Sequence, residues 1–363
     1  MKASTPRPRA RITDVARRAR VSVGTVSHVV TGAVQVSTEL RARVQKAIDA
    51  LGYVPNFHAQ GLRRGPSRVI GVCLPHASTA YLNDLSETFE DVASRNGYGV
   101  MHVYSRHVAA TELDRIKELI RYRVDGLLLV PSTAPRESLD FVHAKGVPLV
   151  VVDRPTGDAR FDHVVLDNRK AMREVATRLV ALGHARILFV CRSRDRQVTQ
   201  HRLQGLEDAR IAATSPLPIS CLELRHDEAL LRGALQRALR GRSPPDAIIA
   251  SNSHQAALVL AALRAIGVET PANVSVVAFD DPEWSRLVVP SLSVVRQPAA
   301  AMAEAAFDLL MQRVNARAGA PRIVALDAVV ELRDSVRTRT RPVAGPAARV
   351  STPAGWRARP RAV

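Results

Sequence analysis

The sequence predicts a small all-α domain at the N-terminus followed by a larger α/β domain with two lobes. Apolar residues recur at helical spacing through residues 12–51, whereas short β-rich runs alternate with helical stretches through residues 69–279. That alternation predicts parallel sheets with helices on both faces. The second region extends to about residue 338, and its length of about 270 residues is too large for one simple core, which favours two lobes.

The first predicted helix begins at Thr13, whose hydroxyl is a suitable N-cap. Asp14 follows in the first turn, where the helix dipole stabilises a carboxylate. Residues 20–22 form the predicted turn, and Ser22 is expected to cap a second helix. Two short helices joined by three residues have the order of a helix-turn-helix, which lays its second helix in the major groove of DNA.

The second predicted helix has an inner and an outer face. Val26, Val29 and Val30 form the inner face. The outer face offers small or polar groups that are able to approach base edges, and the alternative is an ordinary solvent-exposed helix. These outer residues are Val23, Gly24, Thr25, Ser27 and His28.

A third helix is predicted to open at Ser37 and to stop at Gly52. Its apolar stripe consists of Leu40, Val44, Ile48 and Leu51. Beyond it, Asn56 is a plausible cap for one short helix that ends near Leu62. A helix of that length is marginal in water, so we expect it to form only where a partner surface supports it.

Positive charge is concentrated at the two ends of the chain. The formal net charge is +18, and residues 1–68 hold 13 Lys/Arg against 3 Asp/Glu. Residues 337–363 hold seven Arg and no acidic residue, so the middle is nearly neutral. A basic N-terminal module is the electrostatic footprint of phosphate binding. We expect a disordered basic arm at 1–11 and a disordered basic tail at 339–363, the tail being either a nonspecific hold on DNA or an extension without a role.

The second region is predicted to bind ligands beyond the carboxyl ends of its parallel strands. Candidate strands are residues 69–74, 98–104, 126–130, 148–152, 187–191, 247–251 and 274–279, with helical stretches such as 82–94, 109–122, 170–182 and 254–265 between them.

The sequence signatures of several other classes of protein are absent from this chain. The chain has no G-x-G-x-x-G after a strand, no phosphate-loop motif, no G-x-S-x-G and no internal sequence repeat. Cys73, Cys191 and Cys221 are scattered without metal-ligand spacing, which favours three buried, reduced thiols. The apolar runs are too short to span a bilayer, and no secretory signal precedes the basic start. We predict a cytoplasmic, nucleoid-associated protein that is not an enzyme and uses no cofactor or metal.

Short motifs in a fixed order point to a known family. They are D-V-A at 14–16, V-S-V-G-T-V-S at 21–27, V-S at 36–37 and L-G-Y-V-P-N at 51–56, with the alanine and leucine at 59 and 62. Together they resemble the LacI/GalR family of bacterial transcription regulators, and the resemblance covers residues 12 to about 338. It implies that Leu62 enters the minor groove at the operator centre and kinks the DNA. The DNA-binding residues expected from the motif and its resemblance are Thr13, Ser22, Val23, Gly24, Thr25, Ser27, His28, Ser37, Tyr53, Asn56, Ala59 and Leu62.

The resemblance also implies the domain organisation. A helix-turn-helix domain spans 12–55, a hinge helix and linker span 56–67, and a two-lobed periplasmic-binding-protein-like domain spans 68–338. Lobe 1 is expected at about 68–160 and 298–326, and lobe 2 at about 161–297 and 327–338. The chain would cross between them near 154–166, 296–299 and 326–328. Two helix-turn-helix units related by a two-fold axis read an inverted repeat, which predicts a homodimer.

Four positions matched by the resemblance are expected to contact an effector: Asp153, Arg202, Asn252 and Asp280. Carboxylates accept protons from ligand hydroxyl or N–H groups, Asn donates and accepts, and Arg donates in a fork. Tyr81 and Phe161 are candidates for stacking on a ligand ring. The alternatives are that Asp280 caps a following turn and that Arg202 pairs with Glu207 or Asp208 on its own helix.

These patterns predict a DNA-binding transcriptional regulator, more specifically a repressor, whose partners are double-stranded operator DNA, a sugar or related metabolite, and a second copy of the chain. Ser253 departs from the acid that many family members carry after the asparagine, so the runner-up is a regulator whose cleft answers to no small metabolite. A sugar-binding transport component shares the lobed fold but needs export and has no use for a helix-turn-helix.

Overall fold

The computed structural model describes residues 10–31, 36–53, 66–76, 79–223, 228–316 and 319–339. The chain forms two compact units, which divide between Ser67 and Arg68. The expected roles of Asn56, Ala59 and Leu62 lie outside the described residues, as do most of the basic arm and tail.

The first unit contains three helices, α1 (Ile12–Ala19), α2 (Val23–Thr31) and α3 (Thr38–Leu51). Val15, Val26 and Val44, one from each helix, are fully buried and form the centre of its small core. Gly52 ends α3 in the left-handed conformation with φ of 56°, as predicted. These valines, together with the buried Ala16, Ala19, Val29 and Ala47, fix how the three helices meet.

The start of α1 differs from the prediction. The helix begins at Ile12 and Arg11 occupies the capping position, where its backbone N–H donates to Oδ2 of Asp14 at 2.9 Å. Thr13 is exposed in the first turn and caps nothing, so its predicted capping role is wrong. Asp14 supplies an acceptor from inside the helix, and this replaces the hydroxyl cap that the sequence suggested.

The starts of α2 and α3 agree with the prediction. The Oγ of Ser22 accepts a hydrogen bond from the backbone N–H of Thr25 at 3.0 Å. The Oγ of Ser37 accepts one from the backbone N–H of Leu40 at 3.3 Å. Each serine thereby satisfies one N–H that the first turn of a helix leaves without a partner.

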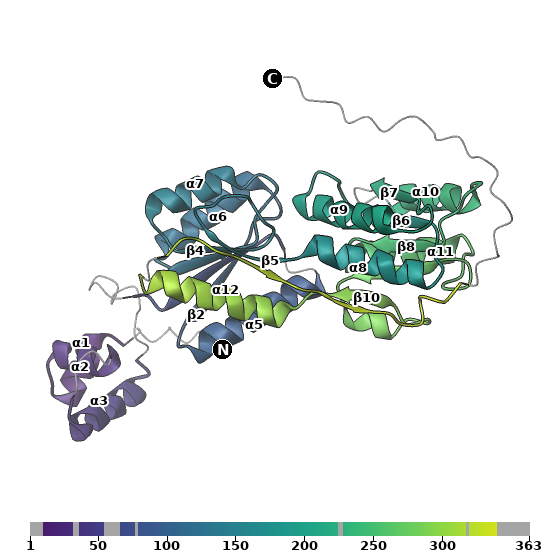
Figure 1. Cartoon of the computed structure of the whole chain (residues 1–363). Coiled ribbons are helices and arrows are strands. Elements are labelled where there is room, and N and C mark those ends of the chain that lie inside the picture. The colour runs from purple at the N-terminus through teal and green to yellow at the C-terminus, as the bar shows by residue number, and fades with distance from the viewer. Residues whose placement is uncertain are drawn as a thin grey trace. The chain divides into compact units, whose positions relative to one another are not determined.

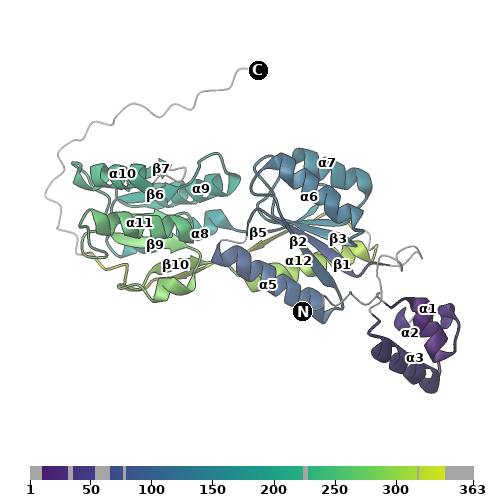
Figure 2. The same cartoon turned by 180° about the vertical axis from the view of Figure 1, so that it is seen from behind.

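The second unit contains two six-stranded sheets with matching strand order. Figures 1 and 2 show both sheets with their covering helices. The orders are β11-β5-β4-β3-β1-β2 and β12-β10-β9-β8-β6-β7, and every pairing is parallel except that of β10 with β12. The first sheet consists of β1 (Val69–Leu74), β2 (Gly99–Tyr104), β3 (Gly126–Leu129), β4 (Leu149–Asp153), β5 (Asp162–Leu166) and β11 (Ile323–Leu326). The second consists of β6 (Ile187–Cys191), β7 (Ile219–Glu223), β8 (Ala247–Ala250), β9 (Ser275–Phe279), β10 (Ser293–Arg296) and β12 (Val329–Glu331).

Helices cover both faces of each sheet, and alternate strand residues pack against the two helical layers. On the first sheet, α5 and α12 lie on one face and α6 and α7 on the other; we name this sheet with its helices the first lobe. On the second sheet, α8 and α9 lie on one face and α10 and α11 on the other, and these form the second lobe. The bounds are α5 (Ala80–Arg95), α6 (Ala109–Arg121), α7 (Arg136–Lys145), α8 (Asn168–Ala181), α9 (Gln197–Ala212), α10 (Glu228–Arg240), α11 (Ser253–Ala265) and α12 (Ala299–Val314), with a 3-10 turn at Glu283–Arg286.

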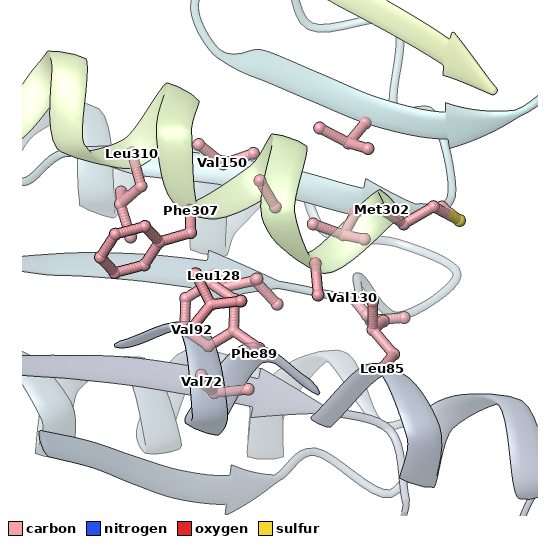
Figure 3. Close-up of a cluster of buried hydrophobic side chains, with 14 of the residues drawn as sticks. Val72, Leu85, Phe89, Val92, Leu128, Val130, Val150, Met302, Phe307 and Leu310 are labelled. Carbon is pink, nitrogen blue, oxygen red and sulfur yellow. The ribbon is translucent and has the colours of Figure 1, made fainter. Parts of the chain in front are cut away.

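Segments far apart in the sequence build the core of the first lobe. Phe307 of α12 meets Phe89 of α5 edge-to-face, with 6.0 Å between the ring centroids. Figure 3 shows both rings beside Leu128 of the neighbouring strand. This packing fixes α5, which carries Tyr81, against α12, which carries Met302, and so shapes one wall of the site described below.

The chain passes between the sheets three times. Two passages match the prediction, Arg296–Ala299 from β10 to α12 and Leu326–Val329 from β11 to β12. The first passage differs, because β5 pairs with β4 in the first sheet and the chain leaves only after Leu166. The expected lobe boundary at residues 160/161 is therefore wrong. No helix in the described ranges is long and apolar enough to cross a membrane.

Candidate functional site

A cavity of about 490 Å³ lies where strands of both sheets end. Residues that follow β1 and β4 line it from the first lobe, and residues that follow β6, β8 and β9 line it from the second. The carboxyl ends of parallel strands share one edge of a sheet, and open α/β sheets bind ligands there. Five of the six residues predicted to contact an effector line this cavity, namely Tyr81, Asp153, Arg202, Asn252 and Asp280.

Two of these residues are aspartates, of which Asp280 is buried and Asp153 is partly exposed to the cavity. Asp153 ends β4 and Asp280 directly follows β9, and both have left-handed φ angles, of 70° and 69°. Burial raises the pKa of both carboxyls, against the opposing influence of Arg154 and Arg202 at Asp153 and of Gln297 and Arg202 at Asp280. Both side chains therefore present oxygen acceptors to the cavity from a backbone conformation that most residues avoid.

Arg202 projects from α9 and its side chain is buried, so the alternative pairing along its own helix does not occur. Its Nε donates to Oδ1 of Asn168 at 2.7 Å, Nη1 donates to the carbonyl of Ser251, and the guanidinium lies 3.4 Å from the centroid of the Phe279 ring. Burial lowers the pKa of Arg202 to about 10, although Asp280 and Asp153 oppose this. The guanidinium is thus held from two sides, and its Nη2 bonds to no residue that the structure describes.

The glycine three residues beyond Arg202 explains its placement. A Cβ at Gly205 would lie 2.1 Å from the backbone carbonyl oxygen of Arg169 on α8. Helices α8 and α9 therefore touch backbone to backbone at this point, which only glycine allows. The close contact fixes α9 against α8 and holds Arg202 above the ends of β8 and β9.

Tyr81 and Asn252 are also partly engaged by the protein. The Tyr81 hydroxyl donates to Sδ of Met302 at 3.3 Å, and burial raises the pKa of Tyr81 well above its usual value. Asn252 caps α11, and its Oδ1 accepts from the backbone N–H of Gln255 at 2.8 Å. Asn252 consequently has both amide N–H donors and one lone pair of Oδ1 left for a ligand.

Phe161 does not line the cavity, so its predicted stacking on a ligand ring is wrong. Its ring is buried in the core of the first lobe, meets the His143 ring edge-on at 6.2 Å and lies under the guanidinium of Arg160. The aromatic side chain precedes β5, whose place beside β4 turns it toward that core.

The cavity also contains residues that the sequence analysis did not single out. Gln297 lies in the second passage between the sheets, and its Nε2 donates to Oδ1 of Asp280 at 2.8 Å. Oε1 of Gln297 and Oε1 of Gln255 are buried without a hydrogen-bond partner in the described part of the protein. Unsatisfied buried acceptors cost free energy, so both glutamines are held in place at a cost to stability.

Six further lining residues are basic and come from both lobes: His76, His107, Arg154, Arg192, Arg196 and His254. The sequence did contain a signal for a basic site. The run R-S-R-D-R at 192–196 places three arginines immediately after a β-rich segment. His76 and His107 gave no comparable signal, because they come from separate segments that only the fold brings together.

The cysteines are only partly as predicted. Cys73 and Cys191 are buried and all three thiols are free. Cys221 is half-buried on β7, and its Sγ lies 3.7 Å from Sγ of Cys191 on β6. The expectation that the three are scattered and buried is therefore corrected for this pair. Among the described residues, no three His, Cys, Asp or Glu side chains are grouped to hold a metal ion.

The first unit exposes the residues predicted to face DNA to different degrees. Val23 is 42% exposed and His28 is also exposed, whereas Val26 and Val29 beneath them are buried. Gly24, Thr25 and Ser27 are half-buried on the same helix, and Tyr53 packs partly on the core. Thr13, Ser22 and Ser37 are exposed at or near the helix starts. The geometry gives α2 one buried side and one open side, as a recognition helix requires.

Comparison with known proteins finds a matching family model for each of the two units. The model of bacterial regulatory proteins of the lacI family matches residues 11–56, and that of the periplasmic binding protein-like domain matches residues 176–336. The HTH-type transcriptional regulator GalS of Salmonella typhimurium is 33% identical over 308 residues, which cover 83% of this chain and 89% of GalS. Catabolite control protein A of Staphylococcus xylosus is 29% identical over 312 residues, covering 84% and 92%.

Solved structures show the same fold. The lac repressor dimer bound to operator and the anti-inducer ONPF superposes with a TM-score of 0.80 at 23% identity, covering 91% of this chain and all of that one. The complex of the transcriptional regulator CelR with cellobiose gives a TM-score of 0.66 at 26% identity, covering 90% and 100%. A helix-turn-helix domain followed by a two-sheet periplasmic-binding-protein-like domain defines a bacterial regulatory protein rather than an enzyme. The chain belongs to the lacI family, as predicted.

Proposed function

We propose that this protein is a transcriptional repressor that binds a pseudo-palindromic operator as a homodimer and is controlled by a small polyhydroxylated metabolite in its cavity. The observation that carries the DNA-binding half is α2, which buries Val26 and Val29 and exposes Val23 and His28. A helix of this kind enters the major groove and reads base edges.

The operator side of the proposal assigns roles along the N-terminal region. Val23, Gly24 and His28 read bases, and the helix starts at Ser22 and Ser37 approach phosphates, which N-terminal N–H groups attract. Residues 56–67 form the hinge helix and linker, and Leu62 wedges into the minor groove. The lac repressor relative is a dimer bound to operator, which supports a dimer here.

The proposal that the cavity binds a metabolite rests on the polar residues that line it. Asp153 and Asp280 accept hydrogen bonds, and Arg202 and Asn252 donate them. Such a set suits a ligand with several hydroxyl groups. Relatives support this class, since one is a ribose operon repressor of Haemophilus influenzae and another structure holds cellobiose.

The experiment begins by selecting DNA from a genomic fragment library with the full chain and measuring affinity for the recovered sequence by fluorescence anisotropy at fixed salt. His28→Ala should lose discrimination at one base pair by about 1–3 kcal/mol. The matched control is His143→Ala, which removes an exposed histidine from α7 of the second unit and should leave DNA affinity unchanged. Recovery of no preferred sequence would reject the DNA-binding role.

A regulator without a metabolite response is the second candidate, favoured by Ser253 at the position after Asn252. Ser253 supplies a backbone N–H to Asp280 at 3.4 Å and no charged side chain. This candidate predicts operator affinity that no sugar, sugar phosphate, nucleobase or nucleoside changes. A shift in operator affinity with any one of them would exclude it.

A further inference from the structure

The basic residues that line the cavity are not needed to bind the hydroxyl groups of a ligand. We name Arg154, Arg192, Arg196, His76 and His107 the arginine cluster. His76 follows β1, His107 follows β2 and Arg154 follows β4, so these three belong to the first lobe. Arg192 follows β6 and Arg196 directly precedes α9, so these two belong to the second lobe. The arginine cluster therefore spans both sides of the cavity.

The carboxylates of the cavity leave part of this charge uncompensated. Nε of Arg154 lies 3.4 Å from Oδ2 of Asp153, and its Nη1 donates to the carbonyl of Pro131 at 2.8 Å. Asp280 is engaged by Gln297 instead, and Asp195 is exposed. No hydrogen bond or ion pair joins the guanidinium of Arg192 or of Arg196 to any residue within the described ranges.

Burial and the close approach of positive groups lower pKa values within the arginine cluster. Burial, followed by repulsion from Arg154 and Arg192, lowers the pKa of Arg196 to about 10. Burial and then Arg154 and Arg196 lower the pKa of His107 to about 3, so His107 is neutral at physiological pH. Partly buried like charges cost free energy unless an anion accompanies them.

The hydrogen bonding of His107 indicates where such an anion would lie. Nη1 of Arg154 is 3.4 Å from Nδ1 of His107, and because a guanidinium only donates, Nδ1 is the acceptor. A neutral imidazole then carries its proton on Nε2, and that atom is buried without a partner among the described residues. His107 therefore holds the guanidinium of Arg154 at the cavity through Nδ1.

We propose that the effector is an anionic polyol, a small molecule with several hydroxyl groups and one phosphate or carboxylate. Its anionic group binds between Arg154 of the first lobe and Arg192 and Arg196 of the second. Its hydroxyl groups bind to Asp153, Asp280 and Arg202. This deepens the proposed function, because it rests on the same cavity and names the chemistry of its ligand.

The arrangement also gives the ligand a way to change the protein. Without an anion, the guanidinium of Arg154 repels those of Arg192 and Arg196 from the opposite lobe. An anion that accepts hydrogen bonds from both sides replaces this repulsion by charge-assisted attraction. Binding of the anionic group therefore favours approach of the two lobes, whereas a neutral sugar leaves the repulsion in place.

The test uses inorganic phosphate and acetate as minimal probes, each titrated by calorimetry into the full chain at constant ionic strength. The variant Arg192→Gln/Arg196→Gln removes the charge of the second lobe. The matched control is Arg194→Gln, which removes an arginine from the same loop that does not line the cavity. The basic N-terminal region is identical in all three proteins, so differences between them report the cavity.

We expect saturable binding of at least one probe, with phosphate and acetate distinguishing a phosphorylated from a carboxylated ligand. The double variant should bind that probe about tenfold more weakly or worse, since each charge-assisted bond lost is worth roughly a factor of ten. Arg194→Gln should bind like the wild type. Absence of binding for both probes, or equal binding by the double variant, would overturn the proposal.

Two further measurements separate this proposal from a structural role and from the proposed function. If the arginine cluster repels itself, the double variant should melt at a higher temperature than the wild type, whereas structural arginines would lower it on removal. Operator affinity measured without ligand tests the proposed function independently. Intact DNA binding with no anion binding would reject only the anionic ligand, and the reverse result would reject only the regulator.

Discussion

Asp153 and Asp280 occupy corresponding positions in two sheets of the same strand order. Asp153 ends β4, Asp280 follows β9, and each strand is third in its sheet. Their φ angles of 70° and 69° place both backbones in the left-handed region. The two lobes thus present one carboxylate each to the cavity through the same local geometry, although the sequence contains no detectable repeat.

This backbone conformation predicts how the two positions tolerate substitution. Asp153→Asn should keep the backbone conformation, because asparagine adopts left-handed φ more readily than other residues with a Cβ, and should lose only the ion pair with Arg154. Asp153→Ala should be less stable than Asp153→Asn by about 1 kcal/mol, since alanine bears the full steric cost. The midpoint of chemical unfolding measures the difference. Equal midpoints for the two variants would contradict a backbone cost at Asp153.

A buried ion pair in the second lobe predicts a pH dependence of stability. Nη1 and Nη2 of Arg333 donate to Oδ1 and Oδ2 of Asp281 at 2.9 and 2.8 Å, and both side chains are more than 90% buried. Burial acts to raise the pKa of Asp281, but the bonds from Arg333, Ser285 and Arg286 outweigh it and hold the pKa well below its usual range. This stabilisation is present above the unfolded pKa, near 4, and is lost as pH falls toward the lower folded value.

We therefore expect Asp281→Asn to cost about 1.5–3 kcal/mol at pH 7, because it removes the charged acceptor of both Nη atoms of Arg333 and leaves only Glu331 as its ionic partner. The variant should also lose less stability than the wild type when pH falls from about 5 to about 2. Urea unfolding at several pH values measures both effects. The control Asp308→Asn changes an exposed aspartate on α12 and should follow the wild type. Parallel acid profiles for wild type and Asp281→Asn would contradict the assignment.

The two helical glycines of the second lobe should respond oppositely to alanine. Gly205→Ala places a methyl group 2.1 Å from a backbone oxygen of α8 and should cost about 1–3 kcal/mol through overpacking. Gly233→Ala in α10 meets only the end of the Arg237 side chain at 3.4 Å. It should stabilise by up to about 1 kcal/mol, because alanine favours a helix interior. Thermal unfolding of both variants checks the opposite signs, and a stabilised Gly205→Ala would refute the close contact.

The hinge proposal yields a prediction for Leu62. Leu62→Ala should weaken operator binding, because the side chain no longer supports the unstacked base step, while leaving ligand binding in the cavity unchanged. Anisotropy with operator DNA and calorimetry with the cavity ligand measure the two effects separately. Equal operator affinity in the variant and the wild type would remove the wedge role.

The neighbouring thiols predict unequal cysteine reactivity. A hydrogen bond from Cys191 and the nearby Arg194 lower the pKa of Cys221 to about 7, against the effect of burial. Burial raises the pKa of Cys73 instead. Iodoacetamide should therefore modify Cys221 first, with a rate that rises as pH passes about 7, because the thiolate is the nucleophile. Mass spectrometry against a Cys221→Ser control locates the adduct, and faster labelling of Cys73 would contradict the assignment.

Local patterns were sufficient to predict the elements with strong signals. The valines of α2 and the continuous apolar runs of β1 and β6 follow from spacing alone, and β1 and β6 have the predicted bounds. The half-exposed pattern of β7, Ile219–Glu223, gave no comparable signal. The prediction of which lobe holds β5 was wrong. The sheet that β5 joins depends on its pairing with β4, and no local sequence pattern encodes that contact.

The residues of the cavity were predictable from the sequence where they come directly at the end of a predicted strand, as Asp153 and Asp280 do. Their neighbours were not, because the arginine cluster draws on separate segments that meet only in the folded chain. Phe161 shows the opposite error, since an aromatic residue near a predicted site packs into the core. Residue type indicated the chemistry in these cases, and tertiary structure decided which residues share the site.

Two cavity side chains are each hydrogen-bonded to a segment that joins the sheets. Arg202 donates to Asn168, which lies just past the first passage, and Asp280 accepts from Gln297, which lies in the second. One hydrogen bond therefore separates the ligand-facing groups from the connections between lobes, with no intervening layer of packed side chains. Under the proposed function, this arrangement would make stability and ligand response separable by mutation. Changes in the cores of the lobes would alter how firmly each lobe is folded, whereas changes at Asn168 and Gln297 would alter how an occupied cavity acts on the connections.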